Sequence, residues 1–230
     1  RENIAGLFSV SLEASDLALT EFTRPYDLHR QYQYRCMMFV AAEKADKAIE
    51  ALMQAYELEY SDGAFSQFVE KAFSSGTKAD VFALMHYTNV MLLLKQKKDE
   101  RAEEMKKALT ANQRFVNEAN APTEDDYPWN LILWNLGKYM RLADSKKIAE
   151  DYITRAMAIT TKPKDKVTMF SYALCMAGDI LNWEMENEGP GVTACRKQFD
   201  TLYEEFMKKN LPDTMRKWFS RGYAEMIPLK

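Results

Sequence analysis

The feature that most constrains the fold is the placement of proline and glycine. Every proline and most glycines fall between segments in which apolar residues recur every three or four positions. That period is typical of helices packed on one face, and the breakers mark the turns between them. The chain has only eight Gly and seven Pro in 230 residues. These are too few turn formers for a many-stranded sandwich or barrel, so the pattern predicts an all-α fold.

The same breakers give the expected boundaries of about nine to ten helices. Segment 80–95 is apolar nearly all round and is expected inside the fold, whereas 97–120 carries a charged face and is expected outside. Residues 1–25 are expected to form an N-terminal packed helix or an arm of a single domain spanning 1–230. The expected helices are 27–42, 44–60, 64–73, 80–95, 97–120, 129–141, a segment capped by Asp144 and Ser145 and ending near Thr160, 167–186, 192–209 and 213–226.

Composition and charge exclude several classes of protein. Apolar residues make up 47% of the chain and charged residues 28%, which is typical of a globular domain and not of a disordered tail. A net charge of −3 provides no global attraction to nucleic acid or to anionic lipid. No apolar run approaches the length of a membrane span. Three cysteines without a CxxC pair predict a reducing intracellular compartment, with cytoplasm and organelle matrix both open.

Three of the expected helices share a pattern of a thin residue, then a large one, then a further contact residue. The second helix of tetratricopeptide repeats resembles this pattern. The three matching triplets are Ala48, Leu52 and Ala55; Ala149, Ile153 and Ala156; and Cys195, Phe199 and Leu202.

The clearest full repeat unit is 130–163. Leu136 and Gly137 match the Leu-Gly pair of the tetratricopeptide family, while Leu133 replaces its usual Trp. Gly137 and Ala149 are expected to let two helix backbones approach closely, because their side chains are small. A weaker unit, 29–60, keeps Ala48 and Ala55.

The repeats are irregular in length. The spacings between successive members of the series Ala48, Ala102, Ala149 and Cys195 are 54, 47 and 46 residues, against about 34 in the tetratricopeptide family. We therefore expect an irregular α-solenoid of antiparallel helical hairpins. A pentatricopeptide-like array and a bundle without repeats remain open alternatives.

The sequence contains little that could support catalysis. Its only histidines are His29 and His86. His86 lies in an apolar segment and is expected to be a hydrogen-bonded core residue, while His29, near Arg24, Arg30 and Arg35, is expected at the surface. No phosphate loop, nucleophile elbow or zinc-protease motif occurs. We therefore expect no enzyme, no cofactor and no metal site.

The tetratricopeptide resemblance also implies which residues would contact a partner. Its inner-surface positions fall on Trp134, Lys138 and Arg141 in the clear unit, and on Arg30 and Gln33 in the weaker one. Such a cationic and aromatic groove would suit an acidic or extended peptide. The resemblance thus implies a protein-interaction scaffold, an adaptor or a structural subunit of a larger complex, which binds a protein partner on its concave face. Aromatic residues expected on first helices are Tyr32, Tyr34, Trp129 and Trp134.

The alternative function is RNA binding by a pentatricopeptide-like organellar protein. Asn130, Asn135 and Lys138 on one first helix, together with the basic stretch Lys95–Lys98, favour it. The acidic overall charge argues against it.

Overall fold

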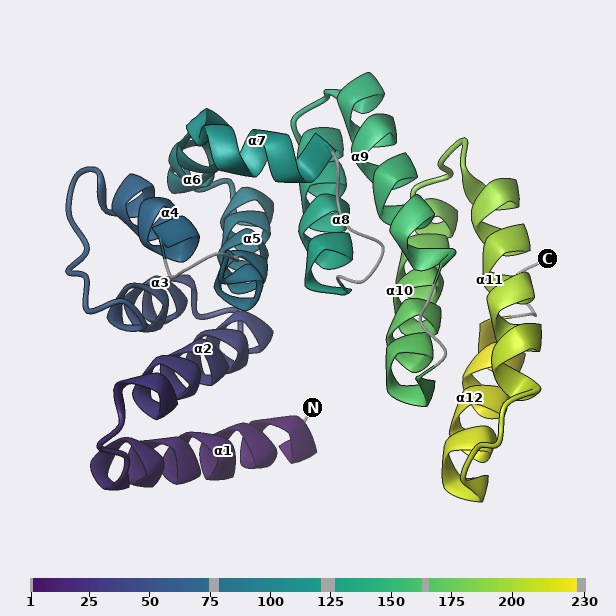
Figure 1. Cartoon of the computed structure of the whole chain (residues 1–230), viewed down its shortest axis with the longest axis horizontal. Coiled ribbons are helices and arrows are strands. Elements are labelled where there is room, and N and C mark those ends of the chain that lie inside the picture. Colours follow the sequence, from purple (N-terminus) through teal and green to yellow (C-terminus); the bar gives the residue numbers. More distant parts are fainter. Residues whose placement is uncertain (1, 75–78, 121–126, 163–165, 227–230) are drawn as a thin grey trace. The chain divides into compact units, whose positions relative to one another are not determined.

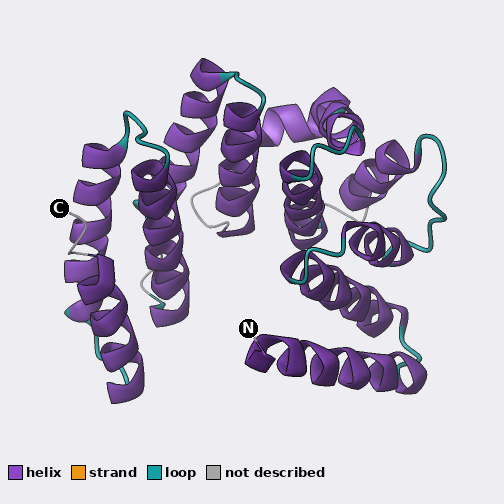
Figure 2. Ribbon diagram, turned by 180° about the vertical axis from the view of Figure 1, so that it is seen from behind, coloured by secondary structure: helices purple, strands orange, loops and turns teal. Residues whose placement is uncertain are grey.

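The computed structural model describes residues 2–74, 79–120, 127–162 and 166–226 (Figure 1). Over these residues the chain forms twelve α-helices and no strand (Figure 2), which confirms the all-α prediction but exceeds the nine to ten helices expected. The helices are α1 Glu2–Glu21, α2 Pro25–Ala41, α3 Ala45–Gln54, α4 Ala64–Ser74, α5 Val81–Gln96, α6 Arg101–Ala111, α7 Gln113–Asn120, α8 Tyr127–Leu142, α9 Lys146–Thr160, α10 Val167–Glu186, α11 Val192–Met207 and α12 Asp213–Met226.

The chain divides into two compact units. Unit 1 comprises Arg1–Pro122 and Leu131–Ile153, and unit 2 comprises Thr123–Asn130 and Thr154–Lys230. Helices α8 and α9 contribute residues to both units. The single domain over 1–230 and its solenoid arrangement stay predictions.

Four helix pairs are joined by the same kind of turn. In α2–α3, α5–α6, α8–α9 and α10–α11, a residue other than glycine adopts a positive φ after the first helix. At the first turn, Glu43 N–H donates to Val40 O (3.0 Å) and Lys44 N–H donates to Phe39 O (2.9 Å), which is the Schellman pattern. The other three turns repeat both hydrogen bonds. The four residues are Glu43 (φ 55°), Lys98 (φ 59°), Asp144 (φ 61°) and Glu188 (φ 49°).

The helices that follow these turns share their pattern of burial. The first thin residue of each helix is almost inaccessible to solvent. The large residue and the contact residue of the three triplets found in the sequence are almost inaccessible as well. These side chains therefore occupy equivalent core positions. The thin residues are Ala48, Ala102, Ala149 and Cys195, and the others are Leu52, Ile153, Phe199, Ala55, Ala156 and Leu202.

Helices α8 and α9 approach each other closely at Gly137. A Cβ atom built on Gly137 would lie 2.7 Å from Ile153 Cγ1 and 3.3 Å from the carbonyl oxygen of Ala149. Both residues are buried. The prediction that small side chains permit a close backbone approach here is confirmed.

We expect Gly137→Ala to destabilise the protein by about 1–3 kcal/mol, as overpacked cores do, although alanine favours the helix by about 1 kcal/mol. Ile153 Cγ1 is held near its own backbone, so it cannot simply swing away from the new methyl group. The measurement is urea denaturation. The double mutant Gly137→Ala/Ile153→Ala should lose less free energy of unfolding than the sum of the losses in the two single mutants. A loss equal to that sum would show that the two positions do not collide.

Two predicted helices are wrong in extent. The helix expected over 97–120 is two helices, because Asn112 adopts an extended conformation (φ −76°, ψ 114°) and its side-chain Oδ1 accepts a hydrogen bond from Phe115 N–H (3.1 Å). Asn112 thus acts as the N-cap of α7. The helix expected over 44–60 ends at Gln54, and Glu57 turns the chain with φ 56°.

Other expectations agree with the structure. The segments 167–186 and 213–226 match α10 and α12 in both bounds, and α5 is buried along most of its length, as predicted. Residues 1–25 contain helix α1, whose buried Ser15 accepts a hydrogen bond from Gln31 of α2 (2.6 Å). The stretch between the expected helices 97–120 and 129–141 lies largely outside the described residues.

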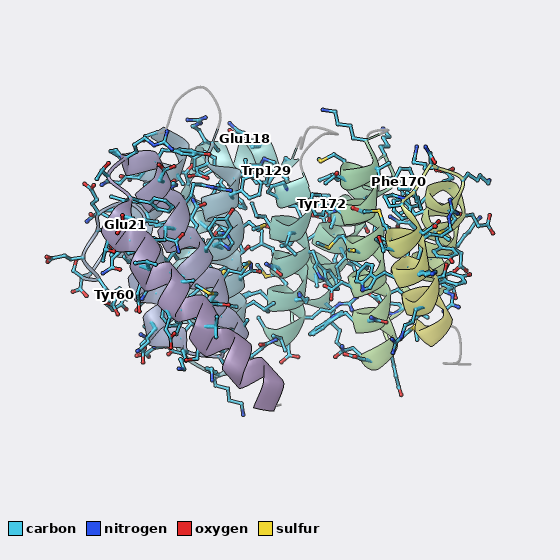
Figure 3. The ribbon with its side chains drawn as sticks, turned by 90° about the horizontal axis from the view of Figure 1, so that it is seen from below. Glu21, Tyr60, Glu118, Trp129, Phe170 and Tyr172 are labelled. Atoms are coloured by element: carbon cyan, nitrogen blue, oxygen red, sulfur yellow. The ribbon has the colours of Figure 1, made fainter. Side chains whose placement is uncertain are left out.

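Unit 2 is held together by aromatic contacts between its helices. Phe170 of α10 is buried and stacks on Phe206 of α11, with ring centroids 5.7 Å apart. Tyr172, two positions along α10, is exposed (Figure 3). The helix therefore presents one face to the core and another to solvent.

Candidate partner-binding site

The structure does not place Trp134 on a surface. Its side chain is 0% exposed, so it cannot contact a partner in this structure, and this part of the expectation is corrected. The physical reason is that α8 is enclosed at successive positions: Ile132, Leu133 and Leu136 are also buried. Lys138 is half-buried, with its Nζ 5.0 Å from the centroid of the Trp134 ring. Arg141 is half-buried as well.

The other two expected contact residues, Arg30 and Gln33, lie together on α2. Gln33 is buried and therefore does not face a partner. Its side-chain Oε1 accepts a hydrogen bond from Arg30 Nη1 (2.7 Å), so it positions Arg30. Arg30 is half-buried.

Beside Arg30 lies a pocket of about 590 Å³ in unit 1. This volume is within the range of small-ligand and side-chain pockets. Its walls come from α2, the start of α5 and the ends of the segments between α3 and α5. The lining residues are Pro25, Tyr26, His29, Arg30, Ala55, Tyr56, Glu57, Ala79, Asp80 and Phe82.

His29 and Asp80 form the floor of this pocket. His29 Nδ1 lies 2.5 Å from Ala55 O, and its Nε2 lies 2.6 Å from Asp80 Oδ2. Both neighbours are acceptors, an arrangement that favours a ring protonated on both nitrogens. Tyr56 OH (3.0 Å) and Gln33 Nε2 (3.3 Å) also donate to Asp80 Oδ2. Gln33 Nε2 also lies 2.8 Å from His29 Nε2.

The two titratable groups stabilise each other's charge. Burial on its own would lower the pKa of His29, but the hydrogen bonds to Asp80 and Ala55 and the charge of Asp80 outweigh burial and raise it. Burial would likewise raise the pKa of Asp80, but His29, the Ala83 amide and Tyr56 hold it below its usual value. The cluster therefore ties α2 to the end of α3 and the start of α5.

Burial shifts the pKa of other titratable groups as well. His86 is buried, as expected, but its Nδ1 has no hydrogen-bond partner among the described residues. Burial and the nearby Arg30 lower the pKa of His86 to about 4, which keeps it neutral. Burial raises the pKa of both Cys36 and Cys175, which opposes thiolate formation. Among the residues described, no three His, Cys, Asp or Glu side chains converge as a metal site would require.

Aromatic side chains surround Arg30 on the outer side of the pocket. Its Cζ lies 4.8 Å from the ring centroid of Phe82 and 5.8 Å from that of Tyr34. Phe82 is 44% exposed, Tyr34 49% and Tyr26 71%. Tyr26, Arg30 and Tyr34 follow at four-residue intervals and so share one face of α2. We call these four residues, Tyr26, Arg30, Tyr34 and Phe82, the Arg30 face.

Unit 2 contains a second pocket of about 550 Å³. Several of its rings pack on one another: Tyr203 and Tyr223 stack with centroids 3.9 Å apart, which is a core-like contact between helices. Trp218 at its edge is 62% exposed. The lining residues are Leu174, Cys175, Gly178, Asp179, Asn182, Phe199, Tyr203, Trp218, Phe219, Arg221 and Tyr223.

Sequence reasoning missed three residues of the first pocket. His29 was expected at the surface but is half-buried. Phe82 and Tyr26 were not expected to contribute, and no sequence signal distinguishes their exposed rings from buried ones. The two asparagines expected to contact RNA are buried: Asn135 donates to Asn89 Oδ1 (2.6 Å), and Asn130 donates to Thr160.

Comparison with known proteins adds no family to this description: no family model, no curated protein and no solved structure matches the chain. None of the described helices combines the length and the apolar character needed to cross a bilayer.

Proposed function

We propose that the protein is a non-enzymatic interaction module, an adaptor or structural subunit, that binds a protein partner on the Arg30 face. The single observation that carries this proposal is the exposure of the Phe82 and Tyr34 rings beside Arg30, a residue that lines a pocket. Exposed clusters of large rings with arginine are characteristic of interaction hot spots.

The hairpin architecture supports the same function. Helical hairpins joined by the same turn and packed through equivalent thin residues are typical of tetratricopeptide-like repeats, which present extended surfaces to partners. The resemblance to that family remains part of the proposal. The RNA-binding alternative is less well supported, because Asn130 and Asn135 are buried and hydrogen-bonded to protein groups.

A site-specific crosslinking experiment tests this function. The full chain carries a photo-crosslinking phenylalanine in place of Tyr34 and is irradiated in lysate of the cells it comes from. We expect a discrete protein adduct that disappears when Arg30→Gln is added. The matched control places the same crosslinker at exposed Lys98, at the turn between α5 and α6. Equal adducts from both positions, or adducts to RNA alone, would contradict the proposal.

A further inference from the structure

We infer that the Arg30 face binds an extended acidic protein segment, with a partner carboxylate on the Arg30 guanidinium and an adjacent apolar side chain in the 590 Å³ pocket. This inference rests on the proposed function and names the chemistry of the partner. Three features support it: the unused N–H donors of Arg30, the residues that hold its guanidinium in place, and the charges of the pocket.

Arg30 has hydrogen-bond donors that the chain does not use. A guanidinium carries five N–H groups, and within the described part of the chain Arg30 spends one of them, on Gln33 Oε1. No carboxylate pairs with it there. Other arginines do form ion pairs with Asp or Glu: Arg24, Arg35, Arg101, Arg114 and Arg196.

The guanidinium is also held in place before a ligand arrives. The Phe82 and Tyr34 rings lie beside it, and stacking on a ring leaves the in-plane N–H groups available. Gln33 fixes one edge and is itself anchored to Asp80 (3.3 Å). A guanidinium held in this way loses little conformational entropy on binding, and two of its N–H groups match the two oxygens of a carboxylate.

The charges of the pocket favour an acidic ligand. Asp80 accepts hydrogen bonds from His29, Tyr56 and the Ala83 amide, so its charge is already compensated. Glu57 also lines the pocket, but it is exposed, where solvent and salt screen its charge. Arg30 is half-buried, and the interaction of a partly buried charge with an opposite charge is stronger. The apolar part of the walls, which includes Pro25, accommodates an aliphatic or aromatic side chain.

The same observations disfavour a nucleic acid as the partner. Affinity for RNA comes largely from several phosphate contacts made by Lys and Arg. The pocket offers one unpaired arginine next to Asp80 and Glu57, on a chain with net charge −3. A single carboxylate needs only one guanidinium.

A random dodecapeptide display library, selected on the immobilised full chain, tests the inference. We expect enrichment of peptides with Asp or Glu beside a large apolar residue. One enriched peptide is then labelled with fluorescein and its Kd is measured by anisotropy. Arg30→Gln should weaken binding by about tenfold or more, as loss of a charge-assisted bond does. The matched control Lys98→Gln, which removes one exposed positive charge at the turn between α5 and α6, should leave Kd unchanged.

A double-mutant cycle separates a direct contact from an indirect one. Replacing the acidic residues of the peptide with their amides should weaken binding to the wild-type protein but not to Arg30→Gln. Arg30→Lys keeps the positive charge but loses the two-pronged guanidinium, so its Kd for the peptide should lie between those of the wild type and Arg30→Gln. This variant replaces Arg30→Gln in the test if Arg30→Gln does not fold.

The outcomes are distinguishable. If peptides are enriched without acidic residues, or bind Arg30→Gln equally well, the acidic-partner inference is wrong while the interaction function stands. If no peptide is enriched on the wild-type protein, both fail. A fluorescein-labelled oligouridine that binds the wild-type chain and not Arg30→Gln would also overturn the inference, in favour of RNA.

Discussion

Replacing Trp134 with alanine is expected to lower the free energy of unfolding by about 3–5 kcal/mol, the range for truncating a buried aromatic side chain. The indole is fully buried, so its removal leaves a cavity that the surrounding helices cannot fill completely. The measurement is urea denaturation followed by circular dichroism. If Trp134 instead contacted a partner, as the repeat resemblance implied, the mutant would keep its stability and lose only binding.

Lys138 provides the control for this mutation. It lies one helical turn from Trp134, with its ammonium group near the indole ring. Because Lys138 is half-buried and the ring is retained, Lys138→Ala should cost no more than about 1 kcal/mol. A Trp134→Ala variant as stable as Lys138→Ala would show that the indole does not fill the core.

Asp80→Asn is expected to cost about 2–4 kcal/mol near pH 5–6, since it leaves the half-buried His29 without its counter-ion. Asparagine can still accept the hydrogen bond from the Ala83 amide that caps α5, so the loss reports the His29 contact and not the cap. The control is Asp27→Asn, which breaks the exposed pair with Arg24 and should cost less than about 1 kcal/mol.

The effect of Asp80→Asn should depend on pH with a defined sign. The pKa of folded His29 is raised above its ordinary 6.5, so its contribution is complete below that pH and is lost as pH rises through the raised value. The pKa of folded Asp80 is lowered from 3.8, so its contribution is present above that pH and is lost as pH falls through the lowered value. The stability difference between wild type and mutant should therefore be largest between about pH 4 and 6.5. A difference that is flat from pH 4 to 9 would contradict the ion pair.

Local signals predicted most of the fold. Proline and glycine marked the ends of α10 and α12 correctly, because these residues act on the backbone wherever they occur. The break between α6 and α7 was missed because Asn112 ends a helix only when its side chain finds the Phe115 amide. Asparagine alone is a weak signal.

The candidate site was less predictable, because its partners are far apart in sequence. His29 and Asp80 are 51 residues apart, and nothing local to either indicates the other. Arg30, one of the candidate contacts, lines the pocket, but its role as a partner contact stays a prediction. No local signal separates an exposed aromatic such as Phe82 from a buried one such as Trp134. Tertiary packing decides their burial.

The shared turns between helix pairs have a consequence for synthesis on the ribosome. Each turn is closed by hydrogen bonds within six residues of one another, so α2 and α3 can pair soon after they leave the exit tunnel. The contact between His29 and Asp80, however, can form only after Asp80 has emerged. Slow translation between the emergence of α3 and the emergence of Asp80 would expose the paired helices α2 and α3 to proteases and chaperones.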